Sequence, residues 1–142
     1  MKKVILAALV AILPLAAAAQ DDYDDGSYWT VTSVDTHPGM FDDYMSDLNN
    51  VWRKSMEMLM DDGKVVSYKV FGNVNARHEE PDLWLMVEWS SGAAYMDTPR
   101  EYWDANAKKL FGSMDKGTEA NIKRGELRTI MSETLLREMT FK

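Results

Sequence analysis

Two ionisable residues occupy positions where they could assist a proton transfer. His37 follows Asp35 by two residues at the end of a predicted strand, where a carboxylate could orient an imidazole as a general base. Glu88 lies among apolar neighbours in the segment PDLWLMVEW. Partial burial there could raise the pKa of its carboxyl group enough for proton transfer. Each residue also has a structural interpretation, because His37 could hydrogen-bond within its turn and Glu88 could pair with Lys69 across a hairpin.

Aromatic side chains are the main candidates for contacting a ligand. Six of them could line a pocket between the predicted helices and the predicted sheet: Tyr44, Trp52, Tyr68, Trp84, Trp89 and Trp103. Asn106 would add a polar group to this pocket, so we place it with His37 and Glu88 in the candidate catalytic set. Such a pocket could bind a small apolar molecule, whereas the competing interpretation is that the rings simply fill the core.

The chain lacks the motifs that bind metals and common cofactors. It contains no HExxH pair, no zinc-ligand cluster, no P-loop and no glycine-rich dinucleotide fingerprint. It has no cysteine, which excludes a thiol nucleophile. The fold must therefore be held together by packing, because no disulfide can form. We therefore expect neither a metal nor a cofactor.

Residues 1–19 have the features of a Sec-type signal peptide. A pair of lysines precedes an apolar run, and Ala17 and Ala19 provide the small residues of an Ala-x-Ala cleavage site. A membrane anchor is the alternative, but Pro14 interrupts the run, and a spanning helix needs about 20 apolar residues. We expect cleavage after Ala19 and a periplasmic or secreted bacterial protein that does not remain in the membrane.

The composition of the chain is that of one acidic globular domain. Of 142 residues, 46% are hydrophobic and 27% are charged, which excludes a disordered or fibrous protein. A formal net charge of −7 makes nucleic acid and anionic lipid unsuitable partners. Residues 20–27, QDDYDDGS, form an acidic segment that we interpret as an N-terminal tail, and residues 28–142 form the domain.

The periodicity of the domain predicts two helices and four strands. Alternating and β-branched segments predict strands over 28–35, 64–71, 83–89 and about 131–141, and a three- and four-residue apolar spacing predicts helices over 40–62 and 98–111. Strand, helix, strand, strand, helix, strand is the split β-α-β order of the ferredoxin-like α+β fold. This fold has a four-stranded antiparallel sheet with both helices on one face.

The strand over 83–89 has no face suited to water. Its odd residues, Leu83 to Trp89, are all apolar and would pack under the helices, while Trp84 and Met86 would lie exposed on the other face. Exposed apolar patches of this kind mark interfaces or ligand sites. A second copy of the sheet, packed face to face at about 10 Å, would cover them, so we expect a homodimer.

Three segments resemble the dimeric α+β barrel superfamily: HPGMFDDYMSDL, VVSYKVF and LWLMVEW. The resemblance covers residues 28–142, and relatives include antibiotic-biosynthesis monooxygenase-like, haem-degrading, EthD-like and NIPSNAP-like proteins. It implies a ferredoxin-like subunit that dimerises through its sheet. The haem-degrading relatives use a histidine on the second long helix, and no histidine lies between Ser91 and Gly125, so we do not expect haem chemistry.

Three functions remain open at this stage. The leading hypothesis is an exported homodimer that binds a small, mostly apolar ligand between sheet and helices. The alternatives are a non-catalytic structural or interaction module and a cofactor-free monooxygenase-like enzyme. A cavity of ligand size would favour binding or catalysis, and catalysis also requires that His37 or Glu88 face that cavity.

Overall fold

The computed structural model describes residues 22–142, so the predicted signal peptide, residues 1–19, lies outside the described residues. The strands are β1 (Tyr23–Thr36), β2 (Val65–Gly72), β3 (Leu83–Trp89) and β4 (Arg128–Phe141). The helices are α1 (Phe41–Asp47), the π-helical turn η1 (Leu48–Trp52), α2 (Arg53–Asp61), α3 (Gly92–Met96), α4 (Arg100–Phe111) and α5 (Met114–Gly125).

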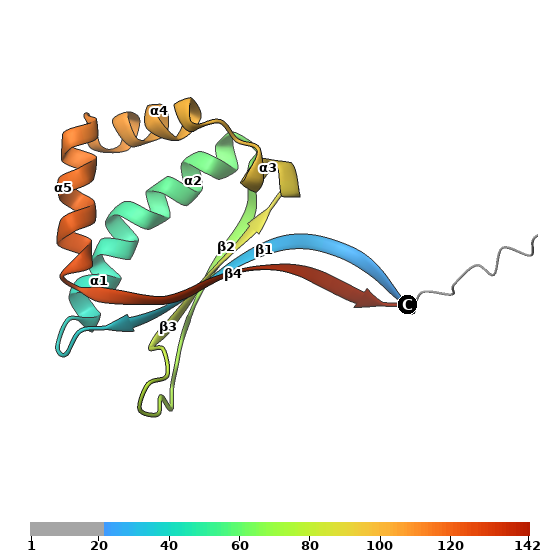
Figure 1. Ribbon diagram of the computed structural model, residues 1–142, viewed down its shortest axis with the longest axis horizontal. Helices are drawn as coiled ribbons and strands as arrows, with labels where there is room; N and C mark the ends of the chain where they lie inside the picture. Colours follow the sequence, from blue (N-terminus) through green and yellow to red (C-terminus); the bar gives the residue numbers. More distant parts are fainter. Residues whose placement is uncertain (1–21) are drawn as a thin grey trace, which may run out of the picture.

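The strands form one antiparallel sheet in the order β2-β3-β1-β4, and the helices cover one face of it (Figure 1). This confirms the predicted four-stranded α+β architecture. Helix α5 is an addition, because the sequence pattern predicted helices only over 40–62 and 98–111. None of the helices within residues 22–142 is long and apolar enough to cross a membrane.

The first strand begins at Tyr23 rather than at the predicted Tyr28. Residues that we interpreted as an acidic tail pair with the end of β4, from Tyr23 opposite Phe141 to Asp25 opposite Met139. Two ion pairs explain why acidic residues are tolerated in this ribbon. Arg137 Nη1 lies 3.1 Å from a carboxylate oxygen of Asp25, and Lys142 Nζ lies 3.2 Å from one of Asp24.

The helix-facing side of β3 is buried as predicted. Leu83, Leu85, Val87 and Trp89 alternate with less buried neighbours, and the Trp89 indole donates a hydrogen bond to Thr30 Oγ1 at 3.0 Å. Strand β2 departs from regular alternation near its start. An irregularity in the pairing between Val65 and Ser67 shifts the alternation, so Val65 is buried and Val66 is 51% exposed.

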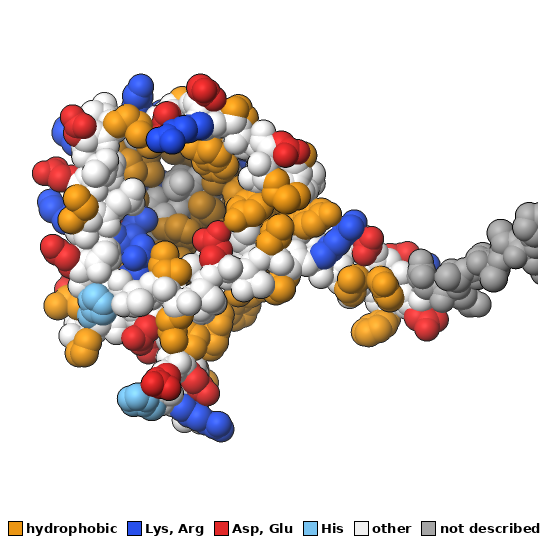
Figure 2. All heavy atoms as spheres, in the orientation of Figure 1, with side chains coloured by type: hydrophobic (Ala, Val, Ile, Leu, Met, Phe, Trp, Pro, Cys, Tyr) orange, Lys and Arg blue, Asp and Glu red, His pale blue; other side chains and the backbone are white. Residues whose placement is uncertain are grey.

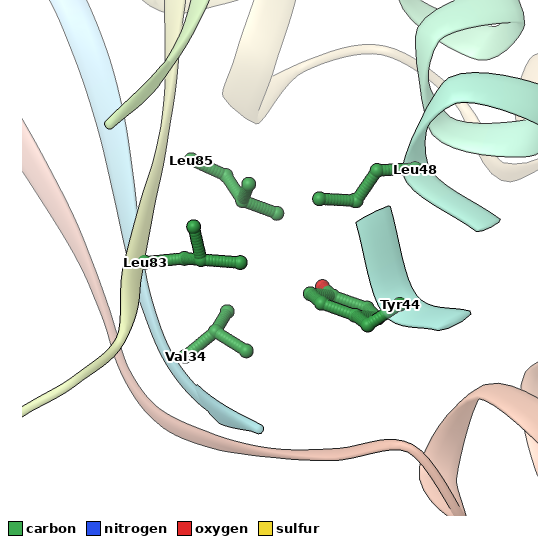
Figure 3. Packing of buried hydrophobic residues seen from close by; sticks show 5 residues of the cluster. All are labelled: Val34, Tyr44, Leu48, Leu83 and Leu85. Atoms are coloured by element: carbon green, nitrogen blue, oxygen red, sulfur yellow. The ribbon is translucent and has the colours of Figure 1, made fainter. Parts of the chain in front are cut away.

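The core beneath the helices begins where β1 and β3 meet α1 and η1. Figure 3 shows the five side chains of this cluster pointing toward one another: Val34, Tyr44, Leu48, Leu83 and Leu85. A second cluster lies toward α2 and α4 and contains Met56, Leu59, Val65, Val87 and Trp89. The two clusters fix the helical layer on the sheet, and Trp52 packs against both of them.

The opposite side of the sheet, here called the outer face, carries apolar side chains from all four strands. Its large members are Trp29, Val31, Phe71, Trp84, Met86 and Leu136. Phe71 and Leu136 are 48% and 47% exposed, and with Trp29 and Met86 they line a depression of about 290 Å³. Trp84 and Met86 lie on the side away from the helices, as predicted, and both are half-buried within this chain.

Candidate functional site

A π-helical turn interrupts the long helix above the sheet. Helices α1 and α2 are joined without a break by η1, whose wider turn carries Leu48 and Trp52 toward the sheet. Such turns add a residue to an α-helix and are frequent at functional sites. Here the turn places Trp52 in the walls of two cavities.

The two cavities lie on the helix-facing side of the sheet. One, of about 190 Å³, lies between α2, α4 and α5, and its walls include Trp52, Leu59, Trp103, Asn106, Phe111 and Arg124. The other, of about 170 Å³, reaches the sheet, and its walls include Tyr44, Leu48, Trp52, Arg124, Arg128 and Glu133. Figure 2 shows the hollow between the helices, with hydrophobic side chains on its walls and basic side chains at one margin. Trp52 and Arg124 belong to both cavities, which therefore adjoin.

Two arginines bring positive charge into this hollow. Arg124, near the end of α5, points its Nε at a carboxylate oxygen of Asp47 at 2.6 Å, and its side chain is only 15% exposed. Arg128, the first residue of β4, lies over Tyr44 with its guanidinium carbon 5.9 Å from the ring centre. Arg124 from α5 and Arg128 from β4 thus both line the second cavity.

Tyr44 is held as a neutral phenol beneath these arginines. Its side chain is almost fully buried, and burial raises the pKa of its hydroxyl above the usual value of 10.0. A hydrogen bond with Arg128 and the charges of Arg128 and Arg124 offset only part of this effect. At neutral pH the hydroxyl therefore keeps its proton and can act as a hydrogen-bond donor.

Three buried donors around the hollow have no hydrogen-bond partner within residues 22–142. They are Asn106 Nδ2, Arg124 Nη2 and Arg128 Nε, and each belongs to a residue that lines one or both cavities. An unmatched buried donor costs about 1–3 kcal/mol, and more when it is charged. These three groups can pair with water or with an acceptor from another molecule.

His37 does not line either cavity. One ring nitrogen lies 2.8 Å from the carbonyl oxygen of Glu126, and the other lies 3.2 Å from Thr129 Oγ1. With its proton on Nδ1, the neutral ring donates to Glu126 and accepts from Thr129, so both nitrogens are used. The structure therefore supports the structural interpretation of His37, in which it joins the loop after β1 to the loop before β4.

Replacing His37 by alanine tests this structural role. We expect His37→Ala to lower the free energy of unfolding by about 1 kcal/mol, because two hydrogen bonds are lost. His78, whose side chain is 93% exposed, provides the matched control, and His78→Ala should change stability by less than about 0.5 kcal/mol. Urea unfolding of both variants makes the comparison, and equal stabilities would contradict the assignment.

Glu88 and Asn106 separate into two different environments. Glu88 lies on the outer face, where it accepts a hydrogen bond from Ser67 Oγ at 2.7 Å, so it pairs across the hairpin with Ser67 and not with Lys69. Glu88 has the parity of Trp84 and Met86, so this candidate catalytic residue does not face the cavities under the helices. Asn106 alone of the candidate catalytic set lines a cavity.

The six aromatic residues predicted to bind a ligand lie in different parts of the structure. Tyr44, Trp52 and Trp103 line the cavities, and Tyr68 packs edge-on against Trp52 with 5.2 Å between ring centres. Trp84 is on the outer face and was wrongly assigned to this pocket. Trp89 is a core residue, which is 6% exposed and packs against Trp103 with 6.4 Å between ring centres.

Arg124 and Arg128 were not singled out from the sequence. They lie in the polar segment KRGELR, which reads as an ordinary solvated stretch. Their four-residue spacing gives no signal, because the helix ends at Gly125 and the strand begins at Arg128. Within residues 22–142, no group of three His, Cys, Asp or Glu side chains could hold a metal ion.

Comparisons with known proteins identify the fold of the chain but not its family. No family model and no curated protein matches the chain. Among solved structures, the chain is similar to HapK from Hahella chejuensis, at 11% identity and a TM-score of 0.52, over 78% of this chain and 91% of HapK. It is also similar to a dimeric ferredoxin-like protein from an uncultured marine organism, at 12% identity and a TM-score of 0.52, over 84% of this chain and 90% of the other. The fold is ferredoxin-like. At these identities the similarities establish the architecture and leave function to the site.

Proposed function

We propose that this protein is an exported homodimer that binds a small, mostly apolar molecule between its helices and its sheet. The observation that carries the proposal is the pair of adjoining cavities with aromatic and aliphatic walls and three unmatched donors. Ligand sites combine apolar walls with a few polar groups in this way. Each cavity is smaller than the roughly 300–1,000 Å³ of most ligand pockets, so the ligand has about one or two rings.

The outer face supports the homodimer. A monomer would leave Phe71 and Leu136 exposed to water, together with the half-buried Trp29, Val31, Trp84 and Met86. Burial of one large apolar side chain contributes roughly 1.5–3 kcal/mol, so covering several per subunit favours association strongly. A second copy of the same face supplies a matching apolar surface, and two sheets stacked in this way form an α+β barrel.

Binding is favoured over catalysis by the positions of the ionisable candidates. His37 is engaged in a loop junction and Glu88 lies on the outer face, so neither reaches the cavities. Asn106 reaches one cavity but carries no titratable group. A solid interior, as expected for a structural module, is disfavoured by the cavities themselves.

Native mass spectrometry of protein purified from a bacterial periplasm tests the proposal. We expect a mass of two subunits plus a small molecule that is released on denaturation.

A pair of alanine variants tests the position of the ligand. Ala107 and Ala105 lie on the same helix, but only Ala107 lines a cavity, while Ala105 is exposed. Ala107→Leu should fill the cavity and reduce ligand occupancy at least about tenfold, and Ala105→Leu should leave it unchanged. A wild-type protein that is monomeric or retains no small molecule would contradict the proposal.

A further inference from the structure

We propose that the bound molecule is a monocarboxylate and that Arg124 and Arg128 bind its carboxylate group. This inference rests on the proposed function and names the chemical class of the ligand. It starts from the two orphaned guanidinium nitrogens, Arg124 Nη2 and Arg128 Nε. A carboxylate accepts hydrogen bonds from the planar fork of arginine with matching geometry, which the compact ammonium of lysine cannot reproduce.

The formal charges around the hollow balance, so the attraction for an anion comes from the unmatched guanidinium donors and not from an excess of positive charge. Asp47 neutralises one edge of Arg124, and Glu133 in the second cavity accepts a hydrogen bond from the Tyr95 hydroxyl at 3.0 Å. Arg128 forms no ion pair within residues 22–142. Because the carboxylates of Asp47 and Glu133 already balance the formal charge of the two arginines, a singly charged ligand is favoured over a doubly charged phosphate ester.

The walls determine the rest of the ligand. Trp52 joins the two cavities, and the first cavity is otherwise bounded by Leu59, Trp103 and Phe111. These surfaces favour a flat apolar body, because aromatic rings stack or meet edge to face. The neutral Tyr44 hydroxyl next to Arg128 offers a further donor for the carboxylate. The ligand class is therefore a small aromatic or aliphatic monocarboxylate.

A matched pair of probes tests this inference. Isothermal titration calorimetry compares 2-naphthoate with 2-naphthamide, which have the same apolar body but differ in charge. We expect the wild-type protein to bind 2-naphthoate at least about tenfold more tightly than 2-naphthamide. Arg128→Gln should remove this preference and leave the affinity for 2-naphthamide within about twofold of wild type.

Two further variants separate the site from general effects of charge and folding. Arg100, whose side chain is 88% exposed, is the matched control, and Arg100→Gln should keep the preference for 2-naphthoate. Arg128→Lys keeps the charge without the planar fork and should lose about fivefold in affinity for 2-naphthoate, so the test stands even if Arg128→Gln fails to fold.

The outcomes distinguish this inference from the function on which it rests. Equal affinities of the wild-type protein for the two probes would overturn the carboxylate assignment and leave ligand binding in place. Failure to bind either probe, together with a native mass that shows no small molecule, would overturn both. An equal loss of preference in Arg100→Gln and Arg128→Gln would show a general charge effect and would also overturn the assignment to Arg128.

Discussion

Replacing Met86 by glutamate is expected to weaken the homodimer at least about a hundredfold. Met86 lies opposite Val31 in the two central strands, with Trp84 two residues away on the same face. In the proposed dimer this position is covered by the partner sheet, so a carboxylate would be buried without a counter-charge. Such burial costs several kcal/mol, and each 1.4 kcal/mol changes the dissociation constant tenfold.

Sedimentation equilibrium over a range of protein concentrations measures this effect. Met114→Glu is the matched control, because Met114 is 37% exposed in the first turn of α5, where the helix dipole tolerates a negative charge. The control should remain as dimeric as the wild-type protein. A Met86→Glu protein that stays dimeric would place the interface elsewhere on the molecule.

The fold could be predicted from the sequence because its strongest signals are local and periodic. The alternation of Leu83, Leu85, Val87 and Trp89 marks one buried face, and the spacing of Tyr44, Leu48 and Leu59 marks one buried helix stripe. Once four strands and two helices are placed in order, short antiparallel connections leave few topologies. The exposed apolar residues on the opposite face of β3 follow from the same parity argument.

The elements that were missed lack a periodic apolar signal. Helix α5 buries only Gly117, so it lacks the apolar stripe that would distinguish it from a polar loop. The early start of β1 depends on Asp25 and Asp24 finding Arg137 and Lys142 at the other end of the chain. Long-range charge pairing of this kind leaves no trace in a local window.

The aromatic residues and Asn106 of the candidate site were predicted from the sequence, whereas its two arginines were missed. Trp52, Trp103 and Asn106 were expected near a pocket between helices and sheet, and they line the cavities. Arg124 depends on Asp47, which is 77 positions away in the chain, and Arg128 reaches the hollow only because a strand begins there. A charged residue in a polar segment is exposed by default, and its burial is decided by tertiary contacts.

Replacing Leu83 by alanine is expected to lower the free energy of unfolding by about 3 kcal/mol. Leu83 is 1% exposed and packs against Val34, Tyr44, Leu48 and Leu85 at the point where the helical layer meets the sheet (Figure 3). Truncation of a fully buried leucine removes its transfer free energy and leaves a void that close-packed neighbours fill only in part. Leu135→Ala is the matched control, because Leu135 is 39% exposed on β4 and should cost less than about 1 kcal/mol.

Urea unfolding of both variants at one fixed protein concentration measures the difference, since the stability of a dimer depends on concentration. The comparison also tests the division of the sheet into two faces. Leu83 follows the parity of the buried face, and its neighbour Trp84 follows the parity of the outer face. Leu83→Ala should therefore reduce the stability of the fold while subunit affinity in the folded state stays within about threefold of wild type. If Leu83→Ala cost no more than Leu135→Ala, the assignment of this face of β3 to the core would be wrong, and with it the position of Tyr44 at the wall of the second cavity.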